Sequence, residues 1–183
     1  MGTVANVSAG KPVATGWLYV APKGTTPPTD ATTALGAAFK DLGYVSEDGV
    51  TNTYSSDTEM IKDWGGQDVL AISSSKTDEF TFTLIESLNA DVLRTIYGSA
   101  NITTGTNTVS ITANGIDNGE KVYVIQVALT NGAMKRIVIP AGVITEVGEI
   151  TYKSDEAIGY EITLNALPDG SGNNHYEYIK LAS

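Results

Sequence analysis

The chain has 183 residues, 42% hydrophobic and 17% charged, which suits one folded domain and is too apolar for a disordered chain. It contains no cysteine and a single histidine, so disulfide scaffolds, zinc fingers and cysteine nucleophiles are excluded. Its net charge of −10 argues against a protein that grips nucleic acid through the phosphates, because that role needs clusters of Lys and Arg.

The predicted elements begin with an N-terminal arm. Residues 1–15 are mostly small and polar and follow no hydrophobic period, so we expect them to be mobile unless a partner holds them. Val4 and Val7 are the candidate contacts of this arm with another subunit. The remainder of the chain, residues 16–183, is predicted to form a single domain.

An extended loop is predicted in the first third of the domain. A strand over residues 17–20 comes first, and further along residues 55–68 follow no period. Loops of that length are usually functional or bound to a partner. Trp64 either covers the core or anchors a contact between subunits, since tryptophan is enriched at interface hot spots. Met60 and Ile61 are candidates for the same contact.

A strand and one short helix are predicted next. Residues 80–84 alternate between apolar and polar side chains, which predicts a strand with its Phe and Leu side chains facing a core. The following segment has the features of a helix that is capped by Asn89 and ends before Gly98. We also expect Leu88 to pack against Leu93 across the first turn.

The second half of the chain reads as a series of strands. They are predicted over residues 109–113, 121–129, 134–139, 143–153, 158–167 and 176–181. Asn131 and Gly132 form the strongest hairpin signal, and Pro140 is expected to break the following strand. Residues 122–129 are apolar on both faces, which predicts cover on both sides, from this chain or from another subunit.

The residue types support an all-β interpretation. Thr, Val and Ile together supply 53 residues against 11 Leu, and β-branched side chains favour strands over helices. About ten strands and one short helix predict an all-β fold with one short helix, built as a β-sandwich or a half-open barrel.

Motifs for catalysis and ligand binding are scarce. Asp169, Ser171 and Asn173 have the spacing of a calcium loop, but the Gly and Glu that such a loop requires are missing. His175 is the one candidate general base, and no Ser-containing elbow accompanies it. We therefore expect no enzymatic activity, no cofactor and no metal site. The longest apolar stretches have about 8 residues against the ~20 that span a bilayer, so no membrane anchor is expected.

Three predicted strands repeat a polar face of carboxylates and threonines. Its residues are Glu79, Thr81 and Thr83, then Glu149 and Thr151, then Glu161 and Thr163. One interpretation is the solvated outer face of an antiparallel sandwich, which the pattern alone favours. The other is the wall of an aqueous channel.

Four segments in this order resemble the major tail proteins, or tail tube proteins, of long-tailed bacteriophages. They are residues 62–66; residues 79–86 with 93–98; residues 139–142 with 148–152; and residues 157–164 with 168–169. The similarity extends over about residues 40–170, and the ordered combination is more specific than any one segment.

The resemblance implies a β-sandwich with one helix whose strands join those of its neighbours into a continuous β-barrel. The copies would form hexameric rings stacked into a tube, and double-stranded DNA would pass through the lumen without specific binding. The polar face of carboxylates and threonines would line this lumen, while the terminal arm and the loop over 55–68 would reach adjacent rings.

The same resemblance places the protein in the phage tail of the virion, after assembly in the host cytoplasm. Tape-measure, tail-terminator and baseplate or tip proteins are its implied further partners. Two alternatives stay open at this point. One is the inner tube of a contractile injection system, and the other is a phage decoration or surface-binding β-sandwich module.

Overall fold

The computed structural model describes residues 2–13, 16–115 and 118–182 of the chain. Within these residues the backbone is mostly β-strand, and the single α-helix is α1 (Ala90–Tyr97). The strands are β1 (Gly10–Pro12), β2 (Leu18–Pro22), β3 (Lys40–Asp41), β4 (Val45–Lys62), β5 (Asp68–Leu84), β6 (Ile102–Thr104), β7 (Val109–Ile111), β8 (Lys121–Leu129), β9 (Met134–Val147), β10 (Tyr160–Ala166) and β11 (Tyr176–Lys180). The predicted all-β fold with one short helix is confirmed.

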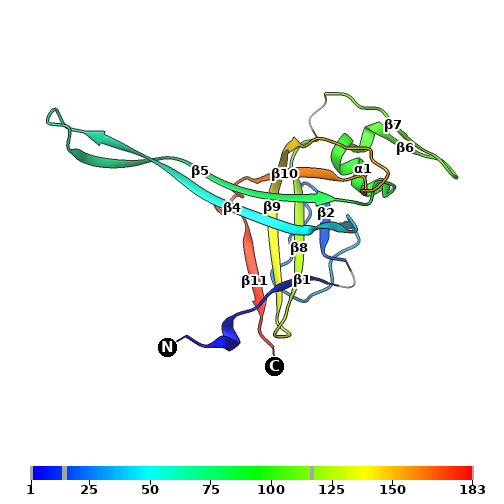
Figure 1. Cartoon of the computed structure of the whole chain (residues 1–183), viewed down its shortest axis with the longest axis horizontal. Helices are drawn as coiled ribbons and strands as arrows, with labels where there is room; N and C mark the ends of the chain where they lie inside the picture. Colours follow the sequence, from blue (N-terminus) through cyan, green and yellow to red (C-terminus); the bar gives the residue numbers. More distant parts are fainter. Residues whose placement is uncertain (1, 14–15, 116–117, 183) are drawn as a thin grey trace.

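Nine of these strands form one antiparallel sheet, in the order β3-β2-β8-β9-β10-β5-β4, with β1 paired to β8 and β11 paired to β9. Strand β9 bends the sheet, because its first half pairs with β11 and its second half with β10. Strands β10, β5 and β4 consequently run across β8 (Figure 1). The order ends at β3 and β4, so the sheet of the described chain is open and corresponds to the half-open form of the predicted architectures.

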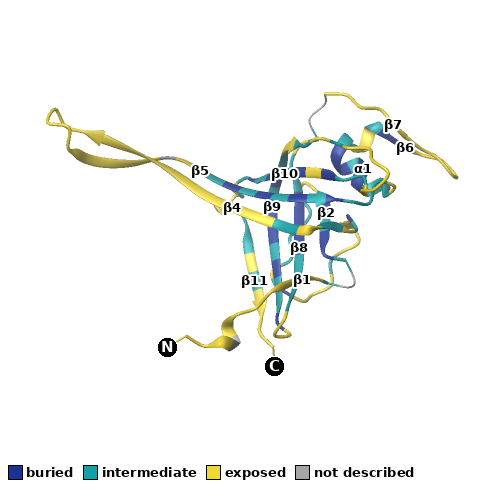
Figure 2. Ribbon diagram, in the orientation of Figure 1, coloured by how far each residue is buried: buried dark blue, intermediate teal, exposed yellow. Residues whose placement is uncertain are grey.

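The apolar core lies on the inner side of the bent sheet and under α1, where Figure 2 shows the buried residues gathering. Phe80 and Phe82 of β5 point into it, as do Ile162 and Leu164 of β10. The alternation predicted for residues 80–84 is therefore confirmed. Burying one such side chain stabilises the fold by roughly 1.5–3 kcal/mol.

The outer face of β8 is also covered over residues 122–125, which confirms this part of the prediction from its apolar sequence, whereas residues 126–129 are half-buried. Val122 and Val124 are buried on the side opposite the core residues Tyr123 and Ile125. The loop over residues 23–39 lies on this outer face, held by a hydrogen bond from Arg136 of β9. The cover comes from the chain itself.

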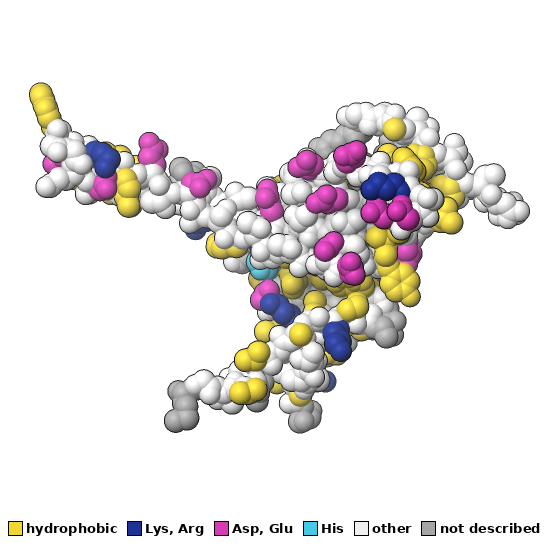
Figure 3. All heavy atoms as spheres, in the orientation of Figure 1, with side chains coloured by type: hydrophobic (Ala, Val, Ile, Leu, Met, Phe, Trp, Pro, Cys, Tyr) yellow, Lys and Arg dark blue, Asp and Glu magenta, His cyan; other side chains and the backbone are white. Residues whose placement is uncertain are grey.

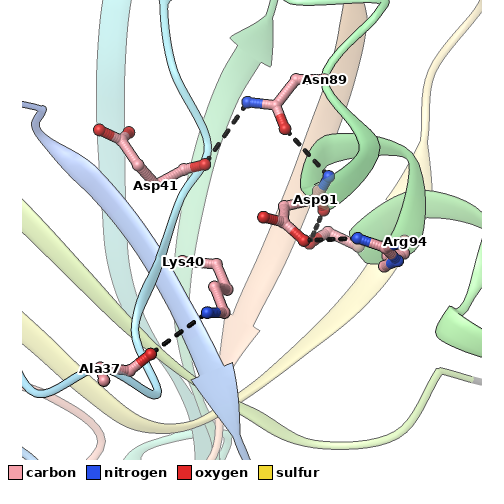
Figure 4. Close-up of polar contacts among 7 residues, drawn as sticks. Ala37, Lys40, Asp41, Asn89, Asp91 and Arg94 are labelled. Carbon is pink, nitrogen blue, oxygen red and sulfur yellow. Dashed lines mark hydrogen bonds and ion pairs between the residues drawn. The ribbon is translucent and has the colours of Figure 1, made fainter. Parts of the chain in front are cut away.

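Helix α1 has the predicted cap residues. The Asn89 side chain accepts a hydrogen bond from the Asp91 N–H at 2.9 Å, which satisfies one of the free donors of the first turn (Figure 4). Gly98 ends the helix with φ of 92°, a conformation that favours glycine. The expected packing of Leu88 on Leu93 is wrong, because the Leu88 side chain is 89% exposed.

Residues 55–68 do not form an irregular loop, and this prediction is wrong. They lie in the hairpin of β4 and β5, which pair from Val45 opposite Leu84 out to Lys62 opposite Asp68. The pairing here leaves both faces of the two-stranded ribbon exposed. Without one buried face the sequence has no reason to alternate, so its period gave no signal.

Strand β9 also differs from the prediction. It continues through Pro140, which lies at an irregularity of the β8–β9 register, between Ile139 opposite Tyr123 and Gly142 opposite Lys121. Proline is tolerated at such a bulge because no ladder hydrogen bond is required there. Past Val147 the chain leaves the sheet, so the predicted strand over 143–153 is wrong in its second half.

The N-terminal arm is partly held by its own chain. Gly10–Pro12 form β1 and pair with residues 127–129 of β8, so these residues need no partner from another subunit. Val4 and Val7 are strongly exposed ahead of β1. Residues 1, 14 and 15 of the predicted arm lie outside the described residues.

Candidate functional site

The most prominent surface feature is a hairpin arm, which we define as residues 53–79 of β4, β5 and their connecting turn. Figure 1 shows it projecting far from the body of the molecule. The turn at its tip is closed by hydrogen bonds from the Asp63 N–H to the Gln67 carbonyl at 2.9 Å and from the Gly66 N–H to the Asp63 carbonyl at 3.0 Å. Trp64 stands in this turn and is fully exposed, at 106%.

The outer part of the arm carries apolar side chains on both faces. Ile61 lies opposite Leu70 on one face, and the neighbouring pair of Met60 and Ala71 lies on the other. The large exposed apolar residues of the arm are Tyr54, Met60, Ile61, Trp64, Val69, Leu70 and Ile72. A lone two-stranded ribbon is marginal in water, and gathered apolar surface marks an interaction site. The arm thus has the chemistry of a surface that another molecule covers.

A buried polar cluster fixes the base of the arm. The Asp78 side chain is buried; it accepts a hydrogen bond from the Asn52 amide at 2.8 Å and contacts His175 Nδ1 at 2.5 Å. The His175 ring also packs edge-on against Phe80, with 5.3 Å between ring centroids. The histidine considered as a general base is thus occupied by contacts that join the arm to the segment before β11.

The structure brings five of the seven predicted acidic-face residues together. Glu161 of β10 lies opposite Thr83 of β5, and Thr163 lies opposite Thr81, with Glu79 next along β5. Directly opposite residues of an antiparallel pair share a face, and this face is turned away from the core. We call it the acidic face.

Glu149 and Thr151 are not on a strand, and their predicted alternation is wrong. Both are exposed in the irregular segment after β9. Glu146 holds the position on β9 instead, opposite Thr163 on the acidic face. A bulge at Thr145 shifts the register there, so a period-two pattern read along the sequence missed Glu146.

The carboxylates of the acidic face have no counter-charges. In the part of the chain that the structure describes, Glu79, Glu146 and Glu161 make no ion pair with a basic side chain. Figure 3 shows many carboxylates and few Lys or Arg side chains on the body between the arm and α1. This surface repels anions.

The Asp169 turn has a structural explanation. Its carboxylate accepts hydrogen bonds from the Ser171 and Asn173 N–H groups and from the Tyr176 hydroxyl, which together lower the pKa of Asp169. Across residues 2–13, 16–115 and 118–182 there is no cluster of acidic and histidine side chains that would hold a metal ion. Among those same residues, no helix has the length and apolar character needed to cross a membrane.

Comparison with known proteins gives the following matches. A family model described as a phage tail tube protein matches residues 6–182. Among solved structures, the chain is similar to the anti-feeding prophage cap, a tube-terminating cap, with 14% identity, a TM-score of 0.42 and full coverage of both chains. No protein with a curated description matches the sequence.

Two further similar structures come from an extracellular contractile injection system, both in the extended state. One is the PVC sheath–tube complex, with 11% identity, a TM-score of 0.44 and coverage of 100% of this chain and 99% of that one. The other is the PVC sheath/tube terminator, with 14% identity, a TM-score of 0.42 and coverage of 91% and 96%.

Proposed function

The chain belongs to the phage tail tube protein family, and on that premise we propose that its copies form hexameric rings that stack into the tube of the tail. In this function the protein is a structural component of the virion. Its partners are copies of itself, with the terminator, tape-measure and baseplate or tip proteins at the ends and inside of the tube. Double-stranded DNA passes through the lumen and is not specifically bound.

The observation that carries this proposal is the hairpin arm. Its Trp64 is fully exposed, and Ile61 and Leu70 leave apolar surface open on a ribbon without a core of its own. Tryptophan is enriched among interface hot spots, whose truncation weakens binding by about 2 kcal/mol or more. We infer that the arm lies against copies in the neighbouring ring, which cover Trp64, Met60 and Ile61.

The open sheet supports the same function. The sheet order ends at β3 and at β4, and β1 and β11 each pair with one strand only, so the described chain leaves strand edges unpaired. Unpaired edges invite pairing with other chains, and a closed ring of copies removes them. Pairing between neighbours would join the sheets into one barrel around the lumen. Val4 and Val7 would then contact an adjacent copy.

The acidic face is our candidate for the wall of the lumen. Glu79, Glu146 and Glu161 are the carboxylates that its strands contribute, with Thr81, Thr83 and Thr163 beside them. Glu149 and Thr151 follow in the segment that begins at Gly148, whose N–H donates a hydrogen bond to the Glu161 carbonyl. A wall of unpaired carboxylates keeps DNA phosphates at a distance, so the polymer slides without sticking.

The proposal is tested by removing the apolar surface of the arm. The variants are Trp64→Ser and the double variant Ile61→Ser with Leu70→Ser. Their thermal unfolding should match the wild type, because exposed substitutions change stability by within about 0.5 kcal/mol. The concentration needed for tube formation, measured by sedimentation and electron microscopy, should rise at least ~10-fold.

Leu88→Ser is the matched control. Leu88 is also a large exposed apolar residue, at 89%, but it lies outside the arm, so its loss should leave assembly unchanged. Arm variants that form tubes at the wild-type concentration would show that the arm does not hold the copies together. A wild-type chain that stays monomeric at high concentration would contradict assembly altogether.

A further inference from the structure

A small cavity lies beside α1, outside the surfaces described so far. Its volume is about 180 Å³, and it is lined by the end of β2, the starts of β3 and β8, and one side of the helix. Four charged residues line it: Lys40, Lys121, Arg94 and Asp91. Three cations around one cavity are unusual in a chain with a net charge of −10.

The single carboxylate of this lining is already used. Asp91 pairs with Arg94 at 3.0 Å, as Figure 4 shows. Lys40 donates its hydrogen bond to the Ala37 carbonyl at 3.3 Å, and among the described residues it has no ion pair with a carboxylate. Within the described chain, the arginine of this cavity is therefore paired with a carboxylate, whereas its two lysines are not.

Of the two lysines, Lys121 has the greater need of a counter-charge. Burial lowers the pKa of Lys121, and in the described residues no acidic group lies within ion-pair distance of it. The acidic residue next to it in the sequence, Glu120, is paired with Lys23 at 2.8 Å. A partly buried ammonium without a partner is costly, and an incoming carboxylate removes that cost.

The cavity lies at an open edge of the sheet. Strand β3 pairs with Tyr19 and Val20 of β2, and in the described chain Ala21 and Pro22 line the cavity without a β3 partner. This is the edge that the proposed function assigns to a neighbouring copy. In the assembled tube a side chain of that copy would therefore already lie next to the cavity, whereas a free anion would have to bind from solution.

We propose, resting on the proposed function, that the Lys40–Lys121 cavity receives a carboxylate side chain from a second copy of this chain. Each copy has 21 acidic residues, and copies of like charge repel. The two lysines then give one specific attractive contact within an interface of like-charged copies. Such a contact selects the register in which neighbouring copies meet.

The test is a zero-length carbodiimide cross-link, which joins a lysine directly to a carboxylate that touches it. Tubes are assembled from an equal mixture of ¹⁴N and ¹⁵N protein, so mass spectrometry separates links between copies from links within one copy. We expect Lys40 or Lys121 to be linked to an Asp or Glu of another copy. The Lys23–Glu120 link within one copy is the internal control.

The variant Lys40→Met with Lys121→Met supplies a second readout. Its melting temperature should equal or exceed that of the wild type, because the partly buried Lys121 ammonium, which has no counter-charge, is removed. The concentration needed for assembly should rise about 10-fold. Lys23→Met, whose lysine is paired within the chain, should assemble as the wild type does.

Three results would overturn the inference. The first is a set of tubes that carry the Lys23–Glu120 link but none from Lys40 or Lys121 to another copy. The second is a double variant that assembles at the wild-type concentration. The third is saturable binding of inorganic phosphate by the monomer at these lysines without any effect on assembly, which assigns the cavity to a small anion. Failure of the wild type to assemble contradicts the proposed function itself and is thereby distinguished.

Discussion

At the scale of single residues, Arg136 is a buried cation that joins a long loop to the sheet. Its side chain is 2% exposed and donates hydrogen bonds to the Asp30 carbonyl at 2.9 Å and to the Gln126 side chain at 3.3 Å. These bonds hold a loop that has no strand of its own against the outer face of the sheet. Burial lowers the pKa of Arg136, and Asp30 opposes that effect.

The Asp30 carboxylate makes the local structure of this loop dependent on pH. Hydrogen bonds from Thr33 and Thr32, with Arg136 nearby, lower the pKa of Asp30 from 3.8 to about 2. A carboxylate with a depressed pKa stabilises the fold above its unfolded pKa and loses that effect as the pH falls toward the folded value. The melting temperature of Asp30→Asn should therefore lie below that of the wild type at pH 5–7. The difference between the two melting temperatures should disappear between about pH 4 and pH 2. Melting curves of both proteins across this pH range test the prediction. A difference in melting temperature that stays constant down to pH 2 would contradict it.

At the scale of elements, the sequence predicted those whose signals are local. Helix α1 was found from Asn89 and Gly98, and the β8–β9 hairpin from Asn131 and Gly132, which has the expected positive φ of 83°. Each of these signals lies within a few residues of its element. The all-β class followed in the same way from side-chain types.

Elements that depend on distant pairing were missed. The arm has no buried face, so residues 55–62 show no alternation although they pair with β5, with register shifts after Asp57 and after Ile61. Glu146 took the place of Glu149 because of a bulge at Thr145, whose hydroxyl donates to the Thr163 carbonyl from the neighbouring strand. Neither strand register can be predicted from the neighbouring residues alone. The acidic face could thus be predicted for β5 and β10 but not for β9.

The polar cluster at the base of the arm is tested by substituting one of its side chains and measuring the stability of the fold. His175→Ala leaves Asp78 buried with Asn52 as its remaining side-chain partner, and a partly unsatisfied buried group costs about 1–3 kcal/mol. Urea unfolding measures this cost, and hydrogen exchange should show faster opening of the arm amides. His175→Asn, which retains a side-chain donor, should recover part of the loss. A change below about 0.5 kcal/mol for His175→Ala would mean that the cluster does not fix the arm.

At the scale of the whole molecule, a compact body carries projections that it does not need for its own core. The hairpin arm and the segment before β1 extend away from the body, and the residues at their ends are exposed (Figures 1 and 2). Both sheet edges are open as well. The proposed assembly gives these features one physical explanation in common, because neighbouring copies would cover them. The acidic face differs, since unpaired carboxylates gain nothing from an apolar or acidic cover and are best left in water.

The acidic face is therefore expected to act in the assembled tube and not in the assembly itself. Reversing three charges, as Glu79→Lys, Glu146→Lys and Glu161→Lys together, should leave tube formation intact because these side chains lie outside the core. Phage carrying this variant should eject DNA more slowly at low salt, since lysines bind phosphates by releasing counterions. Raising the salt concentration should restore the rate, because screening weakens that binding. The matched Gln variant removes charge without adding a cation and should eject at nearly the normal rate. Normal ejection by the Lys variant at low salt would mean that these carboxylates do not line the path of the DNA, even if the tube forms as proposed.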